Sequence, residues 1–189
     1  MPLALVLAVS SAFSSSSFAA DSHSLEPVVV TATRSTQKAG DVLADHVVIT
    51  EEQILQSGQT SIIDLLQTQR SVEVLRNGNA GNNASVYIRG SSDKQVVVLI
   101  DGVRTMSSTS GAATWSAIPL SQIERIEIVM GPMSSLYGAD AVGGVIQIFT
   151  KKGSGAPHLT LSAGAGTYGE RVYSVGVLGS SEGDHPLRY

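Results

Sequence analysis

Two polar stretches of the chain carry the side chains that could bind a ligand. Residues 76–84 read RNGNAGNNA and residues 105–117 read TMSSTSGAATWSA, so both are rich in Asn, Ser, Thr and Gly. Such residues offer adaptable hydrogen bonds to a polar molecule. Neither stretch holds a Cys/His cluster, a nucleophile beside a base, or a carboxylate pair, so we expect no enzyme active site. Trp115 could be a ligand platform or a core residue, and we favour the core.

The composition excludes several kinds of partner and site. The chain has 189 residues, with Lys+Arg 12 against Asp+Glu 16 and a formal net charge of −4. It therefore lacks the basic footprint of a nucleic-acid-binding protein. Cysteine is absent, which rules out disulfides and thiolate metal sites. The length suits one medium domain, or one small domain with appendages.

Short strands and helices are expected to hold the two polar loops. Extended, apolar segments predict four strands, at 47–50, 72–75, 85–89 and 95–100. Thr50 and Gln53 have the spacing of a capping box, and Gly58 ends the short helix that they begin. Ser61 can cap a second helix. These segments predict a fold of short strands and short helices.

The most patterned stretch of the chain is 121–152. Its first four residues, Ser-Gln-Ile-Glu, have the spacing of a helix-capping box. Residues 126–130 then alternate as a half-buried strand does. Gly131 and Pro132 stop this strand, because proline has no N–H donor. A glycine-rich crossover leads into the β-branched run 145–150, so we expect two strands joined by a packed turn.

This stretch resembles the end of the plug domain of TonB-dependent outer-membrane transporters. The usual pattern there is close to E-x-I-R-G-P-x-S-x-L-Y-G-x-x-A-x-G-G-V-I-N-I-x-T. The chain matches it at Glu127, Gly131, Pro132, Ser134, Leu136, Tyr137, Gly138, Ala141, Gly143, Gly144, Val145, Ile146, Ile148 and Thr150. It departs from the family at Met130, where arginine is usual, and at Arg70-Ser71-Val72, where Pro-Gly-Val is usual.

The resemblance gives meaning to the N-terminal residues. Residues 1–19 resemble a secretory signal peptide, with small residues before a cut after Ala19, although a buried helix is an alternative. Residues 20–45 are expected to be a mobile N-terminus. Within it, a β-prone segment resembles the TonB box, a strand offered to the sheet edge of a partner, with a plain N-terminal strand as the alternative. Its residues are Glu26, Pro27, Val28, Val29, Val30, Thr31, Ala32 and Thr33.

The chain changes character after the expected plug domain, 46–152. From Leu159 to Ala165, and again from Tyr173 to Val177, apolar and polar residues alternate around a turn. Such alternation is typical of transmembrane barrel strands. We therefore expect 158–189 to begin a β-barrel with its first hairpin. The alternation is still running near Tyr189, so we expect the chain to be a fragment of a longer protein.

The resemblance implies an α+β fold, with a small mixed sheet and short helices. It also implies TonB-dependent uptake of a large, scarce nutrient across the outer membrane of a Gram-negative bacterium. TonB and the transported molecule would be the partners, with the plug on the periplasmic side of the barrel lumen and no resident cofactor. The run 88–104 looks most like that of cobalamin transporters, so cobalamin is the expected ligand. A siderophore or haem receptor of the same architecture, and a soluble periplasmic interaction domain, are the alternatives.

The same resemblance assigns roles to single residues. In cobalamin transporters the apices of the plug loops touch the ligand. The matching positions are Asn83, Ser85, Ser92, Thr109 and Ser110. The family also pairs plug arginines with barrel carboxylates, and Arg89 matches one of these arginines. Met130 occupies the position of the other, so we expect Arg89 to make most of the polar contact with the barrel.

Overall fold

The structure is a computed structural model that describes residues 28–78, 83–107, 109–115, 118–153, 156–169 and 171–180. The expected signal peptide, and the first two residues of the TonB-box segment, lie outside these ranges. Within them, no helix is both long enough and apolar enough to cross a membrane.

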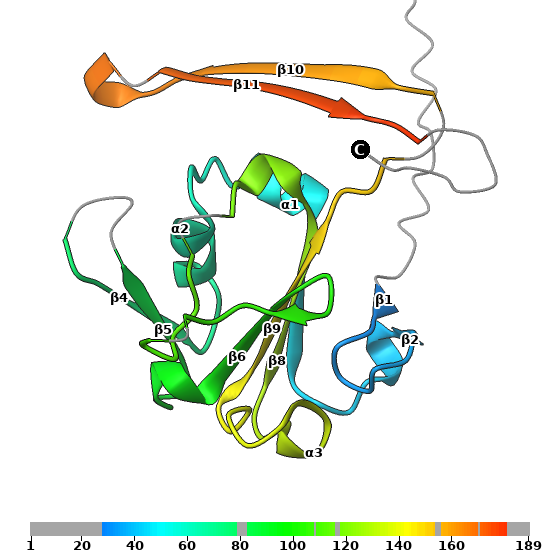
Figure 1. Cartoon of the computed structure of the whole chain (residues 1–189), viewed down its shortest axis with the longest axis vertical. Coiled ribbons are helices and arrows are strands. Elements are labelled where there is room, and N and C mark those ends of the chain that lie inside the picture. The colour runs from blue at the N-terminus through cyan, green and yellow to red at the C-terminus, as the bar shows by residue number, and fades with distance from the viewer. Residues whose placement is uncertain are drawn as a thin grey trace, which may run out of the picture.

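A five-stranded mixed sheet forms the centre of the fold (Figure 1). In spatial order its strands are β3 (His46–Thr50), β8 (Ile123–Met130), β9 (Gly144–Thr150), β6 (Val96–Ile100) and β7 (Val103–Arg104). β6 and β9 run parallel, and the other neighbouring pairs are antiparallel. β8 and β9 occupy the middle and are mostly apolar, as strands covered on both faces must be.

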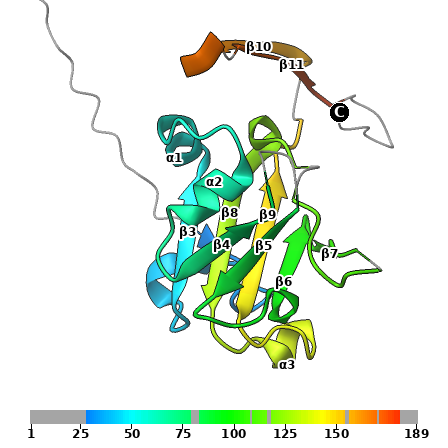
Figure 2. The ribbon, with the colours of Figure 1, turned by 90° about the vertical axis from the view of Figure 1, so that its left-hand side faces the viewer.

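Two short helices and a separate hairpin cover one face of the sheet (Figure 2). They are α1 (Glu51–Gln56), α2 (Ile62–Gln67), β4 (Val72–Arg76) and β5 (Ala84–Ile88). Their buried side chains meet those of the sheet in the main core, which includes Ile54, Leu65, Leu66, Val86, Ile88, Ile126, Ile128, Ile146 and Ile148. Trp115 is buried in the same cluster, so the prediction that it is a core residue is confirmed.

Residues 28–45 cover the opposite face, together with α3 (Ser134–Tyr137). β1 (Val28–Val29) pairs antiparallel with β2 (Gln37–Lys38), and the 3-10 turn η1 (Ala39–Asp41) follows. We expected 20–45 to be mobile. Its described part, 28–45, instead packs on the sheet, because Val29 and Ala32 bury their side chains against Val129. The segment is therefore a layer of the domain rather than a free arm.

The helix signals of the sequence are confirmed at two sites out of three. Thr50 and Gln53 form both hydrogen bonds of the capping box at the start of α1, and Ser61 caps α2. The third signal, the capping box predicted at 121–124, is wrong. Here the chain makes one 3-10 turn, η3 (Leu120–Gln122), and β8 begins at Ile123. Tertiary packing overrides the local capping spacing, because Ile123 is buried in the main core as the first residue of β8.

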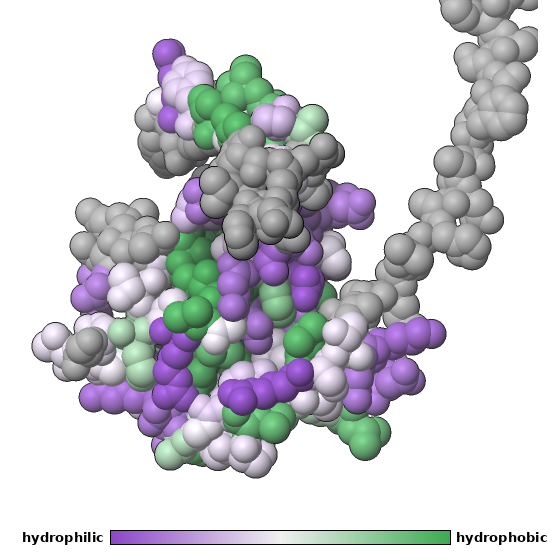
Figure 3. All heavy atoms as spheres, turned by 45° about the vertical axis from the view of Figure 1, so that its right-hand side comes forward, coloured by the Kyte–Doolittle hydropathy of each residue, from purple (hydrophilic) through white to green (hydrophobic). Residues whose placement is uncertain are grey.

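The last described elements form a hairpin that stands apart from the central sheet (Figure 1). β10 (His158–Ala165) and β11 (Arg171–Leu178) pair antiparallel around the 3-10 turn η4 (Thr167–Gly169). Large exposed apolar side chains share one of its faces, namely Leu159, Leu161, Tyr173, Val175 and Val177. The space-filling view shows hydrophobic side chains gathered on this hairpin (Figure 3). The α+β fold with a mixed sheet, short helices and a following amphipathic hairpin is as predicted.

Gly144 allows β8 and β9 to approach closely, and it yields a stability prediction. A Cβ added there would lie 2.4 Å from the carbonyl oxygen of Val129 and 2.9 Å from Cδ1 of Ile88. Since backbone cannot move aside cheaply, Gly144→Ala should lower the free energy of unfolding by about 1–3 kcal/mol. Denaturant unfolding of the purified chain measures this. Gly176→Ala is the control, because nothing lies within 4 Å of its added Cβ; equal losses in both variants would contradict the packing.

Candidate functional site

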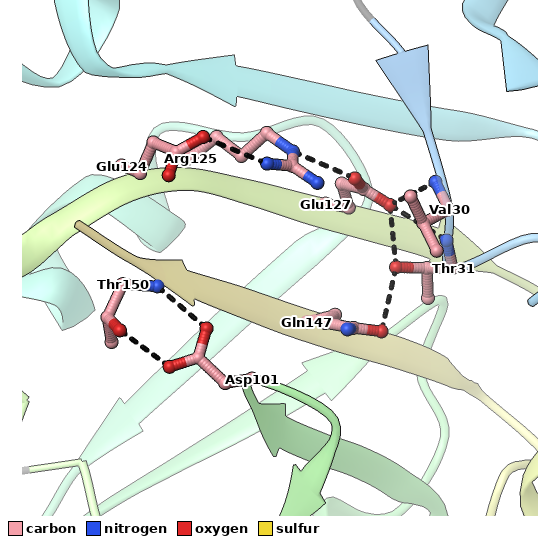
Figure 4. A network of polar contacts seen from close by, with 8 residues as sticks. All are labelled: Val30, Thr31, Asp101, Glu124, Arg125, Glu127, Gln147 and Thr150. Carbon is pink, nitrogen blue, oxygen red and sulfur yellow. Dashed lines mark hydrogen bonds and ion pairs between the residues drawn. The ribbon is translucent and has the colours of Figure 1, made fainter. Parts of the chain in front are cut away.

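The described part of the segment expected to be a TonB box, 28–33, is docked rather than offered to solvent. Val29, Thr31 and Ala32 are all buried, with Thr31 at 0% exposure. β1 occupies only the first two of these residues, and the chain then turns back towards β2. The segment therefore lies against β8 with its central threonine pointing into the domain (Figure 4).

A buried carboxylate on β8 holds this segment. Oε2 of Glu127 accepts hydrogen bonds from the backbone N–H of Val30 at 2.9 Å, from that of Thr31 at 2.8 Å, and from the Thr31 hydroxyl at 2.7 Å (Figure 4). Its Oε1 accepts one from Nε of Arg125 at 3.0 Å. Glu127 is fully buried. A buried charge is stable only when it is paired and hydrogen-bonded, and these four donors meet that requirement.

Arg125 is itself held by three neighbours. Its guanidinium lies 3.6 Å from the centre of the Phe149 ring and donates to Glu124 at 3.1 Å as well as to Glu127. A guanidinium stacked on a ring and paired with two carboxylates has little freedom to turn. Arg125 therefore presents a fixed positive charge to Glu127.

Gln147 on β9 completes the polar contacts of Thr31. The Thr31 hydroxyl oxygen lies 3.1 Å from the side-chain oxygen of Gln147. A hydroxyl has one hydrogen, and the shorter contact to Glu127 uses it. We therefore assign the Gln147 amide the opposite orientation, in which its Nε2 donates to Thr31. In this orientation the Thr31 hydroxyl donates to Glu127 and accepts from Gln147.

Tyr137 on α3 closes the other side of the segment. Its hydroxyl donates to the backbone carbonyl of Thr31 at 2.8 Å, and the guanidinium of Arg34 lies 4.7 Å from its ring centre. Burial raises the pKa of Tyr137, and the nearby Arg34 offsets only part of this rise. The phenol consequently stays protonated, and remains a donor, throughout the physiological pH range.

The raised pKa of Tyr137 gives a prediction for alkaline pH. Because the folded-state pKa lies above the unfolded value of 10.0, the contribution of the protonated phenol is fully present below pH 10.0 and is lost as the pH rises through the folded-state pKa. Tyr137→Phe should cost about 1 kcal/mol at neutral pH, because the Thr31 carbonyl loses its donor. It should also flatten the stability decline above pH 10.0. Unfolding measured from pH 8 to pH 11 tests both effects; parallel curves for the two proteins would contradict this role.

These contacts decide what the segment can do while docked. The N–H groups of Val30 and Thr31 and the carbonyl of Thr31 all bond within the domain. A strand added to a partner's sheet needs the same backbone groups. Docking and strand addition therefore exclude each other at these residues, and the segment must leave Glu127 before it can pair.

Two of the five expected ligand residues come together around a carboxylate that the sequence analysis missed. The Ser85 hydroxyl donates to Asp93 at 2.9 Å, and the Ser92 hydroxyl donates to the other oxygen of Asp93 at 3.3 Å. Ser92 also caps the 3-10 turn η2 (Asp93–Gln95). Asn83 lies one residue before β5, where its carbonyl accepts from the N–H of Asn77 at 3.2 Å. The only signal for Asp93 was its place next to Ser92.

The other two expected ligand residues lie on a separate turn. The backbone N–H groups of Thr109 and Ser110 both lie 3.3 Å from the Ser107 hydroxyl. Ser107 also bonds through its backbone to Ala112 and Gly111, so contacts within this turn hold residues 107 and 109–112 together. Across the described ranges, no group of three or more His, Cys, Asp or Glu side chains is arranged to hold a metal ion. The loop can offer a polar ligand hydroxyl groups and amides.

Arg89, the residue expected to contact a barrel, has a partner inside the domain. Its guanidinium pairs with Asp45, which also binds Arg70 at 2.7 Å. Met130 is buried in the main core nearby, and its N–H donates to the Asp45 carbonyl at 2.8 Å. The sequence analysis gave no role to Asp45 or Arg70, although Arg70 marked a departure from the family pattern.

Comparison with known proteins is consistent with this architecture. Residues 38–145 match the family model described as TonB-dependent Receptor Plug Domain. The chain is 40% identical over 174 residues to the vitamin B12 transporter BtuB of Vibrio cholerae, covering 91% of the chain and 28% of that protein. It is 39% identical over 142 residues to BtuB of Vibrio vulnificus, covering 75% and 23%. The chain thus spans less than a third of the length of these relatives.

The solved structures that this chain resembles are receptors of the same kind. A mutant of the ferric enterobactin receptor PfeA of Pseudomonas aeruginosa aligns with a TM-score of 0.65 and 26% identity, covering 86% of this chain and 25% of that one. The siderophore receptor PirA of Acinetobacter baumannii aligns with a TM-score of 0.57 and 28% identity, covering 71% and 22%. The relatives are transporters and receptors rather than enzymes. The chain belongs to the TonB-dependent receptor plug domain family.

Proposed function

We propose that the chain is the plug of a TonB-dependent outer-membrane transporter that takes up a cobalamin. The observation that carries this proposal is the 40% identity to a vitamin B12 transporter over 91% of the chain. This match is long enough to include the ligand loops and the 28–33 segment.

The polar loops suit such a ligand. Cobalamin carries primary amide groups around its ring, and amides donate and accept hydrogen bonds. Asp93 is a hydrogen-bond acceptor already oriented by Ser85 and Ser92, while Thr109 and Ser110 add hydroxyls on the neighbouring loop. A few placed polar groups of this kind fix the orientation of a bound molecule.

The docked segment supplies the coupling step. In the proposed cycle, ligand binding on the loops favours a state in which residues 28–33 leave Glu127. The freed backbone then pairs with TonB as an added strand, and TonB pulls on the plug. Because docking and pairing use the same N–H groups, the free segment is available to TonB only after release.

A chimeric receptor tests the proposal. The full chain replaces the matching segment of the Vibrio cholerae vitamin B12 transporter, and the chimera is produced in cells that lack their own cobalamin transporter. We expect uptake of radiolabelled cyanocobalamin that disappears in cells without TonB. Absence of uptake from a chimera that reaches the outer membrane would refute the proposed function.

A siderophore receptor is the second candidate, because solved structures at 26–28% identity are receptors for siderophores. A second chimera, in which the chain replaces the matching segment of PfeA, separates the two. If the ligand loops are built for cobalamin, the first chimera transports cyanocobalamin and the second fails to transport ferric enterobactin. The reverse pattern would favour the siderophore function.

A further inference from the structure

Arg104 joins one of the polar loops to the helix that holds residues 28–33. It is the last residue of β7, and the loop 105–117 follows it directly. Its guanidinium donates to the backbone carbonyl of Tyr137 and pairs with Asp140 at 2.8 Å. Tyr137 is the last residue of α3, and the carbonyls of a helix's last turn have no donor within the helix. Arg104 therefore supplies the donor that the end of α3 lacks.

Tyr137 connects this contact to the docked segment. Its carbonyl accepts from Arg104, while its hydroxyl donates to the Thr31 carbonyl at 2.8 Å. Its side chain is buried in a cluster with Leu99 and Ala141. Because a close-packed side chain cannot shift at one end alone, a displacement of the carbonyl also moves the hydroxyl.

The turn after α3 makes the contact with Arg104 a tight one. Gly138 has a φ of 90°, and a Cβ added there would lie 3.4 Å from Nη2 of Arg104. The Ala141 N–H donates to the Gly138 carbonyl at 3.0 Å, and the Met133 N–H donates to the Ala141 carbonyl at 2.8 Å. α3 and this turn are thus one closed unit, which Arg104 contacts through Tyr137 and Asp140.

The strand that carries Arg104 is easily displaced. β7 has two residues and lies at the edge of the five-stranded sheet, where it pairs only with β6. The first loop residue, Thr105, adds a hydrogen bond from its N–H to the Val98 carbonyl at 2.9 Å. An edge strand with so few hydrogen bonds opens locally at low cost. A ligand bound by the loop 105–117 can therefore move Arg104 while the middle of the sheet stays intact.

We infer that Arg104 is a positioning residue through which the loop 105–117 controls the release of residues 28–33. While Arg104 holds α3, Tyr137 donates to Thr31 and the segment stays docked. When a bound ligand moves the loop, Arg104 leaves the Tyr137 carbonyl, and the docked state loses the hydrogen bond to Thr31. The ligand-dependent part of this inference rests on the proposed function.

Hydrogen exchange of the purified full chain, with no ligand present, tests the link between Arg104 and the segment. Protection of the Val30 and Thr31 amides should fall roughly fivefold in Tyr137→Phe, as expected for one net hydrogen bond. Arg104→Ala should produce a similar fall, because the hydroxyl is no longer positioned. The double variant should fall no further, since both substitutions act on one contact. Lys152→Ala removes an exposed basic residue and is the control, which should leave both amides unchanged.

Three results of this experiment would overturn the inference. The first is normal protection of the two amides in Arg104→Ala. The second is a double variant whose loss is the product of the two single losses, which would make the two contacts independent. The third is an equal loss of protection in the β4–β5 hairpin, which would show that Arg104→Ala loosens the whole domain.

Cross-linking in the chimeric receptor tests the ligand-dependent part. Thr33→Cys is cross-linked to a TonB that carries a cysteine, with and without cyanocobalamin. Arg104→Ala should raise the yield without the vitamin roughly fivefold, and should reduce the increase on adding the vitamin by the same factor. An unchanged increase would overturn the role of Arg104 in release. If the chimera that keeps Arg104 does not respond to cyanocobalamin, the proposed ligand is refuted, and the exchange experiment still decides the link.

Discussion

Replacing Glu127 with Gln should release residues 28–33 from the sheet while leaving uptake intact. The substitution keeps the shape of the side chain but removes the charge that four donors surround. Hydrogen bonds to a charged group contribute roughly 1.5–3 kcal/mol each, and a buried partner left alone adds a penalty. Because Arg125 keeps Glu124 as a second partner, we expect a total loss of about 3 kcal/mol.

Hydrogen exchange measures this release at the two amides concerned. Those of Val30 and Thr31 should lose their protection in Glu127→Gln, while amides in the middle of β9 should change far less. Glu124→Gln is the matched control, since it removes the exposed carboxylate bound to the same arginine. It should change stability by no more than about 0.5 kcal/mol. Full protection of the two amides in Glu127→Gln would show that the carboxylate does not hold the segment.

Replacing Val29 with Pro should abolish uptake and leave ligand binding at the cell surface unchanged. Proline removes a backbone donor and restricts φ, so this residue can no longer pair within an added strand. In the chimeric receptor, cyanocobalamin uptake should fall to that of cells without TonB. Uptake and surface binding are measured side by side with the radiolabelled vitamin.

The matched variant Val29→Ala separates pairing from packing. It shortens a side chain buried against Val129 but keeps the N–H group, so docking weakens while strand addition remains possible. Uptake should therefore persist in Val29→Ala. Normal uptake in Val29→Pro would mean that another part of the chain couples the receptor to TonB.

The sequence predicted where the strands of this fold lie better than it predicted the long-range contacts between them. Continuous apolar runs located β6 and β9, because burial on both faces leaves a readable pattern. Alternation at 126–130 located β8, but the prediction that this strand is half-buried is wrong. Glu127 and Val129 are fully buried, because residues 28–45 cover the second face of β8. The capping signal at 121–124 failed because packing against the core overrides a local preference. Ile123 is buried in the main core and draws the chain into β8, which a local spacing rule cannot foresee.

Long-range polar contacts account for most of what the sequence could not show. Thr31 and Glu127 lie 96 residues apart, and Thr31 and Gln147 lie 116 apart. No local pattern marks a buried carboxylate on a strand that otherwise reads as apolar. Arg89 was recognised, but Asp45 and Arg70 were not, because only the folded chain brings them together.

Cross-linking of the 28–33 segment to TonB tests the central claim most directly. Thr33 is exposed and lies close in the chain to Val30 and Thr31, which Glu127 holds. Thr33→Cys in the chimeric receptor can be cross-linked to a TonB that carries a cysteine. We predict that cyanocobalamin increases the cross-linked product strongly, and that Glu127→Gln gives the same high yield without the vitamin. Equal yields with and without cyanocobalamin in the chimera that keeps Glu127 would contradict a ligand-released coupling strand.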